Sequence, residues 1–215
     1  KVWSRRADGT GEPSLLIDFD MPVAEMSWAP DGRFLVLRTA GTGGIEGGRD
    51  LYLWDSESDE PPRRLLAQEV DEASPAVSPD GRWLAYTSNE SNRYELYVRP
   101  FPDVEDGRWQ ISVEGGRSPR WSPDGSELFF FDADLDLMVV RIEPGPTFQA
   151  SPPQPLFTLP PYIATSDINI AYDIAPDGER FVFLSYLIGG QDDDEEPQAI
   201  LVQNFATELR ARMPR

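Results

Sequence analysis

One short corner recurs four times along this chain, and its recurrence constrains the fold more than any other feature of the sequence. The triplet Pro-Asp-Gly stands at residues 30–32, 79–81, 123–125 and 176–178. The proline fixes φ at the second position of a turn, the aspartate bonds neighbouring backbone amides, and the glycine accepts a positive φ. Apolar residues lie on both sides, so each corner predicts a tight hairpin between two antiparallel strands.

The spacing of the corners indicates a repeat. Asp31, Asp80, Asp124 and Asp177 are separated by 49, 44 and 53 residues, which fits the blades of a β-propeller with loops of variable length. Three consecutive positions, the fourth to sixth after each aspartate, are apolar: Leu35-Val36-Leu37, Leu84-Ala85-Tyr86, Leu128-Phe129-Phe130 and Phe181-Val182-Phe183. A strand that is apolar on both faces is covered on both, as the middle of a stacked blade must be.

Further strands complete each unit. We predict third strands at 51–54, 95–101, 137–142 and 199–205, and fourth strands at 63–67, 108–113 and 154–159. Residues 1–17 read as a third and a fourth strand alone, so the units hold two, four, four, four and three strands, seventeen in all. One such sheet has two apolar faces, so it is stable only when neighbours cover them.

The predicted fold is therefore all-β: a single β-propeller domain over residues 1–215, built of four-stranded antiparallel blades. It has about four to five blade equivalents, namely a partial blade at 1–20, blades at about 21–70, 71–113 and 114–160, and a terminal blade at 161–215. We expect an incomplete C-terminal arc of a larger propeller that lacks a blade and a half or more of N-terminal sequence. The missing blades would come from upstream sequence or from self-association.

Composition excludes several classes of function. The formal net charge of -19 argues against nucleic acid and anionic membranes as partners, because phosphate binding needs clustered Lys and Arg. No run approaches the roughly 20 apolar residues that span a bilayer. The chain has no histidine and no cysteine, which removes the imidazole base and the thiolate nucleophile. Paired carboxylates could still act as acid and base, but 38 acidic residues produce such pairs by chance, so no catalytic residue, cofactor or metal is expected.

Three polar segments resemble functional sites, and for each we favour a structural interpretation. Asp132, Asp134, Asp136 and Glu143 have the spacing of a calcium loop, but Leu137 replaces the required glycine, so a hairpin turn is expected. The glycine-rich segment 40–50 lacks the lysine and the helix of a phosphate loop, and the acidic segment 189–197 is typical of a solvated loop. The tryptophans at 28, 54, 83 and 121 are expected in packing between blades.

Binding residues are sought in loops on one rim. In a propeller, the connections from second to third strand and from fourth to first strand emerge on the same face, around the central channel. Arg49, Arg93, Arg117 and Tyr162 lie in such loops and are the candidate partner contacts.

The repeat resembles the TolB-like, WD-repeat-like β-propeller repeat, whose hallmark is an aromatic-Ser-Pro-Asp-Gly turn followed by an apolar strand. Residues 88–130, 172–184 and 199–210 are similar to the C-terminal propeller of bacterial membrane-anchored serine/threonine protein kinases. That resemblance implies a non-catalytic sensor module on the extracytoplasmic (periplasmic) side, tethered by an upstream transmembrane helix. Its rim would bind a protein, a peptide or a small ligand.

Two other functions remain open. A soluble periplasmic TolB-like interaction protein would carry the same repeat, and so would the gating propeller of a prolyl-oligopeptidase-like hydrolase. The chain itself contains no kinase motif and no GxSxG elbow.

Overall fold

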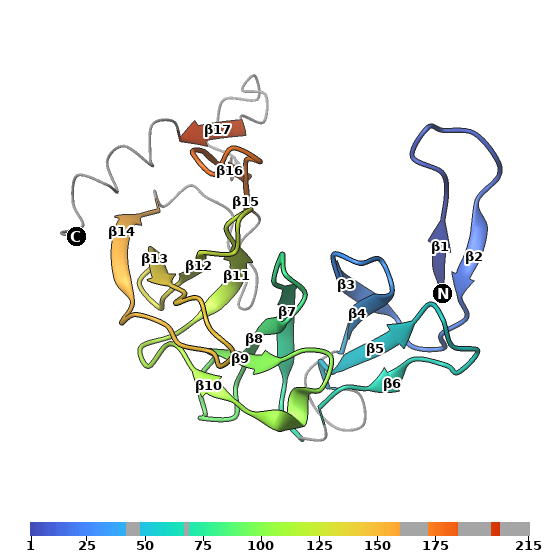
Figure 1. Ribbon diagram of the computed structural model, residues 1–215, viewed down its shortest axis with the longest axis horizontal. Coiled ribbons are helices and arrows are strands. Elements are labelled where there is room, and N and C mark those ends of the chain that lie inside the picture. The colour runs from blue at the N-terminus through green and yellow to red at the C-terminus, as the bar shows by residue number, and fades with distance from the viewer. Residues whose placement is uncertain (42–47, 67–68, 160–171, 185–198, 203–215) are drawn as a thin grey trace, which may run out of the picture.

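The computed structural model describes residues 1–41, 48–66, 69–159, 172–184 and 199–202; for the last of these ranges it describes the backbone only. Their regular structure is seventeen β-strands and one 3-10 turn, Val104–Asp106, with no α-helix among the described residues. The strands form five antiparallel sheets arranged side by side in an open arc (Figure 1). The predicted all-β, incomplete propeller is confirmed.

The five sheets are numbered as blades in chain order, and in each the strands follow one another from the inside of the arc outwards. Blade 1 holds only β1 (Val2–Ser4) and β2 (Ser14–Ile17). Blade 2 consists of β3 (Val23–Trp28), β4 (Phe34–Thr39), β5 (Leu51–Asp55) and β6 (Arg63–Arg64). Blade 3 consists of β7 (Glu72–Val77), β8 (Trp83–Ser88), β9 (Glu95–Pro100) and β10 (Trp109–Gln110).

Blade 4 is formed by β11 (Arg117–Trp121), β12 (Glu127–Phe131), β13 (Asp136–Arg141) and β14 (Gln154–Thr158). Blade 5 has three strands, β15 (Tyr172–Ile174), β16 (Phe181–Leu184) and β17 (Ala199–Val202). Among the described residues, each blade has the number of strands that the sequence predicts. Two fourth strands, β6 and β10, are shorter than expected, although single backbone bonds from Leu65 to Leu51 and from Ile111 to Leu96 continue both pairings.

The four Pro-Asp-Gly corners adopt one conformation. In each, the glycine has φ between 69° and 74° and donates its amide to the carbonyl three residues earlier. The aspartate accepts the amide two residues later, as Asp80 does from Arg82 at 3.1 Å. Hydrogen bonds hold the pKa of Asp124 and Asp177 below its usual value, so these side chains remain charged acceptors. Each corner therefore links the first two strands of a blade.

The core lies between the blades. The strand residues Val36, Leu51 and Leu53 of blade 2 pack against Leu84 and Tyr86 of blade 3. In the same way one face of blade 3 packs on blade 4, and one face of blade 4 packs on blade 5. Each second strand in blades 2 to 4 is consequently buried on both faces, as the continuous apolar pattern predicts.

The two end faces of the arc are open among the described residues. In blade 5, Val182 and Leu184 are 36% and 52% exposed, whereas their counterparts in blade 3, Ala85 and Thr87, are fully buried. At the other end Trp3 and Leu15 of blade 1 are exposed as well. The expectation that Trp28 is packed between blades is wrong, since it is 49% exposed; Trp83 and Trp121 are buried as expected.

Candidate functional site

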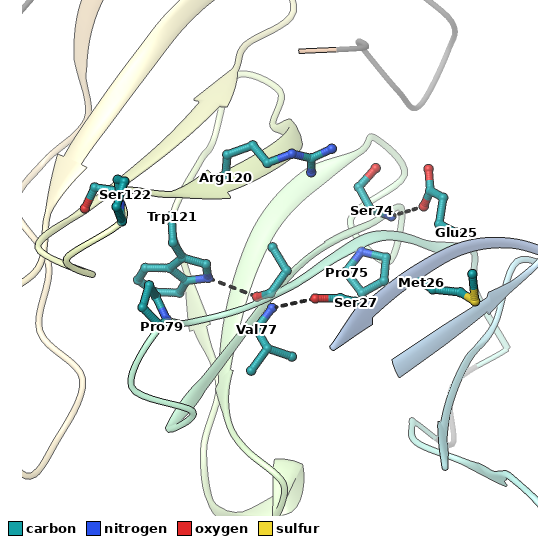
Figure 2. Close-up of a pocket in the computed structure, with 12 residues that line it drawn as sticks. Glu25, Met26, Ser27, Ser74, Pro75, Val77, Pro79, Arg120, Trp121 and Ser122 are labelled. Atoms are coloured by element: carbon teal, nitrogen blue, oxygen red, sulfur yellow. Dashed lines mark hydrogen bonds between the residues drawn. The ribbon is translucent and has the colours of Figure 1, made fainter. Parts of the chain in front are cut away.

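A groove runs along the inner strands of blades 2, 3 and 4, where a complete propeller has its central channel. Its volume is about 490 Å³, and it is lined from β3, β7 and β11 and by the corners that follow β7 and β11. Figure 2 shows Met26, Pro75, Val77 and Trp121 along its wall, with Glu25 and Arg120 near its upper border. The lining is mixed, with apolar side chains and a few polar groups, as in ligand-binding clefts of proteins.

The inner strand of blade 3 is tied to both neighbouring blades. The amide of Ser74 donates to Glu25 Oε2 (2.8 Å), and the amide of Val77 donates to Ser27 Oγ (3.1 Å), both in β3 (Figure 2). From the other side, the indole nitrogen of Trp121 donates to the Ala76 carbonyl. Since side chains occupy these backbone groups and Pro75 has no N–H, β7 is a poor template for an added strand.

The two charged groups of the groove differ in how they are neutralised. Glu25 forms an ion pair with Arg38, with 2.8 Å between Oε2 and Nε, and both side chains are largely buried. Arg120 has no ion pair within the described residues: it donates to the Pro119 carbonyl and lies 5.6 Å from the ring centre of Tyr172. A cation without a carboxylate partner in a partly enclosed groove attracts an anionic group.

The predicted rim residue Arg49 takes part in a hydrogen-bond network between blades 2 and 3. Its guanidinium bonds Asp71 (3.3 Å) and the Tyr94 hydroxyl (2.8 Å), and this hydroxyl donates to Asp71 in turn (2.8 Å). Burial and the Asp71 carboxylate raise the pKa of Tyr94, which keeps its proton in place for that bond. Much of the hydrogen-bonding capacity of Arg49 is thus used inside the protein.

The other three rim residues differ from Arg49 and from one another. Arg93 bonds Glu95 (2.8 Å) and the Val113 carbonyl, yet its side chain is 54% exposed. Arg117, at the start of β11, is half-buried, and its Nε has no hydrogen-bond acceptor within the described part of the chain. Tyr162 lies outside the described residues. Among the three described residues, Arg117 has the least neutralised side chain.

A repeated acidic anchor, which sequence reasoning missed, sets the geometry of this rim. In blades 2 to 4, the residue at or just before the start of the third strand bonds a fourth-strand or following residue: Asp50 bonds Arg64, Glu95 bonds Ser112, and Asp136 bonds Thr158. Glu95 also accepts the Gly115 amide, so it fixes the loop that leads into blade 4. The recurrence of an acid at one register position is the signal that could have revealed these anchors.

The segment with calcium-loop spacing forms the expected hairpin turn between β12 and β13. Asp132 Oδ1 accepts the amides of Asp134 (3.0 Å) and Asp136 (2.9 Å), and Leu135 has a φ of 67°. The carboxylate of Asp132 is thus bonded within its own turn. Across the described residues, no three His, Cys, Asp or Glu side chains gather in an arrangement that could hold a metal ion.

Comparison with solved structures shows the β-propeller fold. TolB from Acinetobacter baumannii superposes with a TM-score of 0.58 at 15% sequence identity, over 92% of this chain and 45% of TolB. An oligogalacturonate lyase from Vibrio parahaemolyticus gives 0.59 at 13% identity, over 91% of this chain and 55% of the lyase. The resemblance to TolB-like propellers is confirmed at the level of the fold.

Sequence comparison adds one relative. An uncharacterised Agrobacterium fabrum protein, Atu1656, is 27% identical over 128 residues, which are 60% of this chain and 42% of that protein. No family model matches the sequence. The chain spans about half the length of these similar proteins. No helix of the described residues is long and apolar enough to cross a membrane.

Proposed function

We propose that this chain is a non-catalytic binding module that acts as the extracytoplasmic sensor region of a receptor-type bacterial serine/threonine kinase. The observation that carries the binding role is the inner groove, whose lining combines apolar side chains with Arg120, a cation that no described carboxylate neutralises. The sensor role is supported by the similarity of the repeat to the kinase-linked propellers. An upstream membrane helix would tether the module.

The ligand that fits this groove is a protein segment, a peptide or a small molecule with one anionic group. A carboxylate placed against Arg120 gains charge-assisted hydrogen bonds in a partly desolvated site. Apolar parts of the ligand would lie against Pro75 and Trp121. The rim residues Arg93, Arg117 and Tyr162 would add contacts at the mouth, while Arg49 would support the loops that present them.

The non-catalytic assignment is supported by residue chemistry. The sequence offers no histidine or cysteine, and the titratable groups with raised pKa among the described residues are engaged in structural contacts. Tyr172, for example, donates its hydroxyl to the carbonyl of Ser118 between blades 4 and 5. The oligogalacturonate lyases of similar fold are enzymes, and one of them was solved with manganese.

Titration with a short peptide tests the binding role. The probe is a tripeptide, blocked at both ends, with a central glutamate, and the readout is the NMR signals of Arg120 Nε–H and the Trp121 indole N–H. We expect both signals to shift in the original protein, and Arg120→Gln, which lacks the first reporter, to abolish the shift of the Trp121 signal. Arg141→Gln is the matched control, because Arg141 is an exposed arginine on β13 outside the groove. Equal shifts in both variants would refute the groove as the binding site.

The upstream part of the gene tests the sensor role separately. A kinase catalytic domain followed by one membrane helix is the expected arrangement. A secretory signal peptide directly before the propeller would instead favour the TolB-like interaction protein. A downstream α/β-hydrolase domain would favour the gating propeller.

A further inference from the structure

The face of blade 2 that looks toward blade 1 is half uncovered. Trp28 and Met26, both on β3, are 49% and 55% exposed. They share this face with Leu35 and Leu37, with which they pair across the sheet and which are almost completely buried. The exposed part of the face is therefore the inner part, close to the axis of the arc.

Two blades with a complete predecessor bury an aromatic side chain at an equivalent position. Trp121 occupies in blade 4 the position of Trp28 and is 9% exposed, with its indole nitrogen 2.9 Å from the Ala76 carbonyl of β7. Tyr172 occupies in blade 5 the position of Met26 and is 5% exposed, with its hydroxyl 2.9 Å from the Ser118 carbonyl of β11. In both cases the inner strand of the preceding blade supplies the acceptor.

Blade 1 covers only the outer part of the face of blade 2. Its Val2 and Ile17 pack on Leu35 and Leu37. Among the described residues β1 pairs with β2 alone, so the edge of β1 that faces the inside of the arc carries backbone groups with no strand beside them (Figure 1). The equivalent strands β5 and β9 pair on both sides, with a second strand inside and a fourth strand outside.

One kind of partner would both cover Met26 and Trp28 and pair with the open edge of β1. An antiparallel hairpin that pairs its second strand with β1 places its first strand at the inner edge, in front of β3. There its backbone would offer Trp28 a carbonyl, as Ala76 does for Trp121. A helix or an irregular loop would leave the edge of β1 unpaired.

We propose that the inner face of blade 2, formed by Met26 and Trp28 beside the open edge of β1, is the docking surface for a β-hairpin of this same repeat. The hairpin β7–β8 is the template for the partner. It presents the small residues Ala85 and Thr87 to blade 4, on the face where Trp121 packs, and these leave room for a large aromatic ring. The partner hairpin carries small side chains at those two positions and buries Trp28.

An extended protein tests this proposal. A copy of residues 72–94, comprising β7, β8 and the loop to the third strand, is joined in front of Lys1, with E72Q and W83F in the copy so that it adds neither a buried carboxyl nor a tryptophan. We expect acrylamide quenching of Trp28, measured as the difference from W28F, to fall to the level of Trp121. Trp3 is the internal control: it lies on the other face of β1, so its quenching should not change.

Three further proteins make each outcome decisive. A copy with shuffled residues should leave Trp28 as accessible as in the original chain. In the original chain, Trp28→Arg should leave the urea midpoint of unfolding nearly unchanged, because the face is open, whereas Trp121→Arg should lower it strongly.

Three results would overturn the proposal. In the first, Trp28 remains quenchable in the folded extended protein. In the second, Trp28→Arg unfolds the original chain. In the third, Trp28 of the original chain would become protected as its concentration rises, which would assign the face to a second copy.

Discussion

Glu72 accepts a hydrogen bond from the backbone amide of Leu51, at 3.3 Å, across the interface between blades 3 and 2. Its side chain is completely buried, and Oε1 has no hydrogen-bond partner among the described residues. Burial, together with the nearby Asp50 carboxylate, raises the pKa of Glu72 to about 8. The carboxyl group of Glu72 is thus protonated and uncharged in the folded protein over much of the pH range around 7.

This proton makes the stability of the interface depend on pH. The folded-state pKa of Glu72, about 8, lies above the ordinary value of 4.5, so the folded state holds the proton more tightly than the unfolded state. The contribution of this bound proton to the free energy of unfolding is therefore fully present below about pH 4.5 and is lost as the pH rises to about 8. Glu72→Gln stays neutral, so its stability relative to the original protein should grow by about 2–4 kcal/mol between pH 5 and 9.

Urea unfolding at a series of pH values measures that difference. Glu105→Gln is the matched control, because Glu105 is exposed, and its difference from the original protein should stay constant. A Glu72→Gln curve parallel to that of the original protein would show that the buried carboxyl is ionised throughout.

The Trp121 indole links two blades, whereas Trp28 has no such acceptor. Replacing Trp121 with phenylalanine removes the indole hydrogen bond to the buried Ala76 carbonyl and should cost about 1–3 kcal/mol of unfolding free energy. Trp28→Phe should change it by less than about 0.5 kcal/mol, as is usual for exposed positions. Chemical denaturation of both variants is the measurement, and equal losses would contradict the assignment of the two tryptophans.

The buried carboxylate of Glu95 holds the rim of blade 3. It accepts the Ser112 hydroxyl, the Gly115 amide and Arg93 Nε, so Glu95→Gln places an amide against several donors. We expect a loss of about 1–3 kcal/mol in unfolding free energy and faster amide hydrogen exchange at residues 112–116. If Glu95→Gln were as stable as Glu105→Gln, the acid would not be an anchor.

Gly116 lies where no side chain fits. A Cβ built there would approach Ser112 Oγ to 2.3 Å and the Leu96 amide nitrogen to 2.5 Å, and the second of these is backbone. Gly116→Ala should therefore destabilise the chain by about 1–3 kcal/mol through overpacking. At Gly145 the nearest atom would be 3.7 Å away, so Gly145→Ala should be tolerated. Thermal unfolding of the two variants decides whether the loop that leads into blade 4 lies as close to β9 as described.

The repeat of the sequence predicts most of the fold. Proline, aspartate and glycine determine the corner by local geometry alone, and the apolar pattern of residues such as Val36 and Ala85 shows that both faces are covered. These features are local in the chain or recur at a fixed offset, so no knowledge of the tertiary contacts is needed to read them.

The sequence does not reveal which side chains the neighbouring blades use. Arg49 lies in a rim loop as predicted, but its bonds to Asp71 and Tyr94 involve residues 22 and 45 positions away. Trp28 and Trp121 occupy the same place in the repeat and differ only in whether an inner strand precedes them. The sequence does not distinguish Arg120, because a strand arginine resembles an ordinary solvated residue until the groove is known.

Amide hydrogen exchange tests most directly that the molecule is an arc of stacked sheets which protect one another. The strand β8 has neighbouring blades on both faces, whereas one face of β16 is open, with Leu184 52% exposed. We predict that residues 83–88 exchange through global unfolding and more slowly than residues 181–184, which exchange through local opening. Exchange at 181–184 as slow as at 83–88 would contradict the stacked arc.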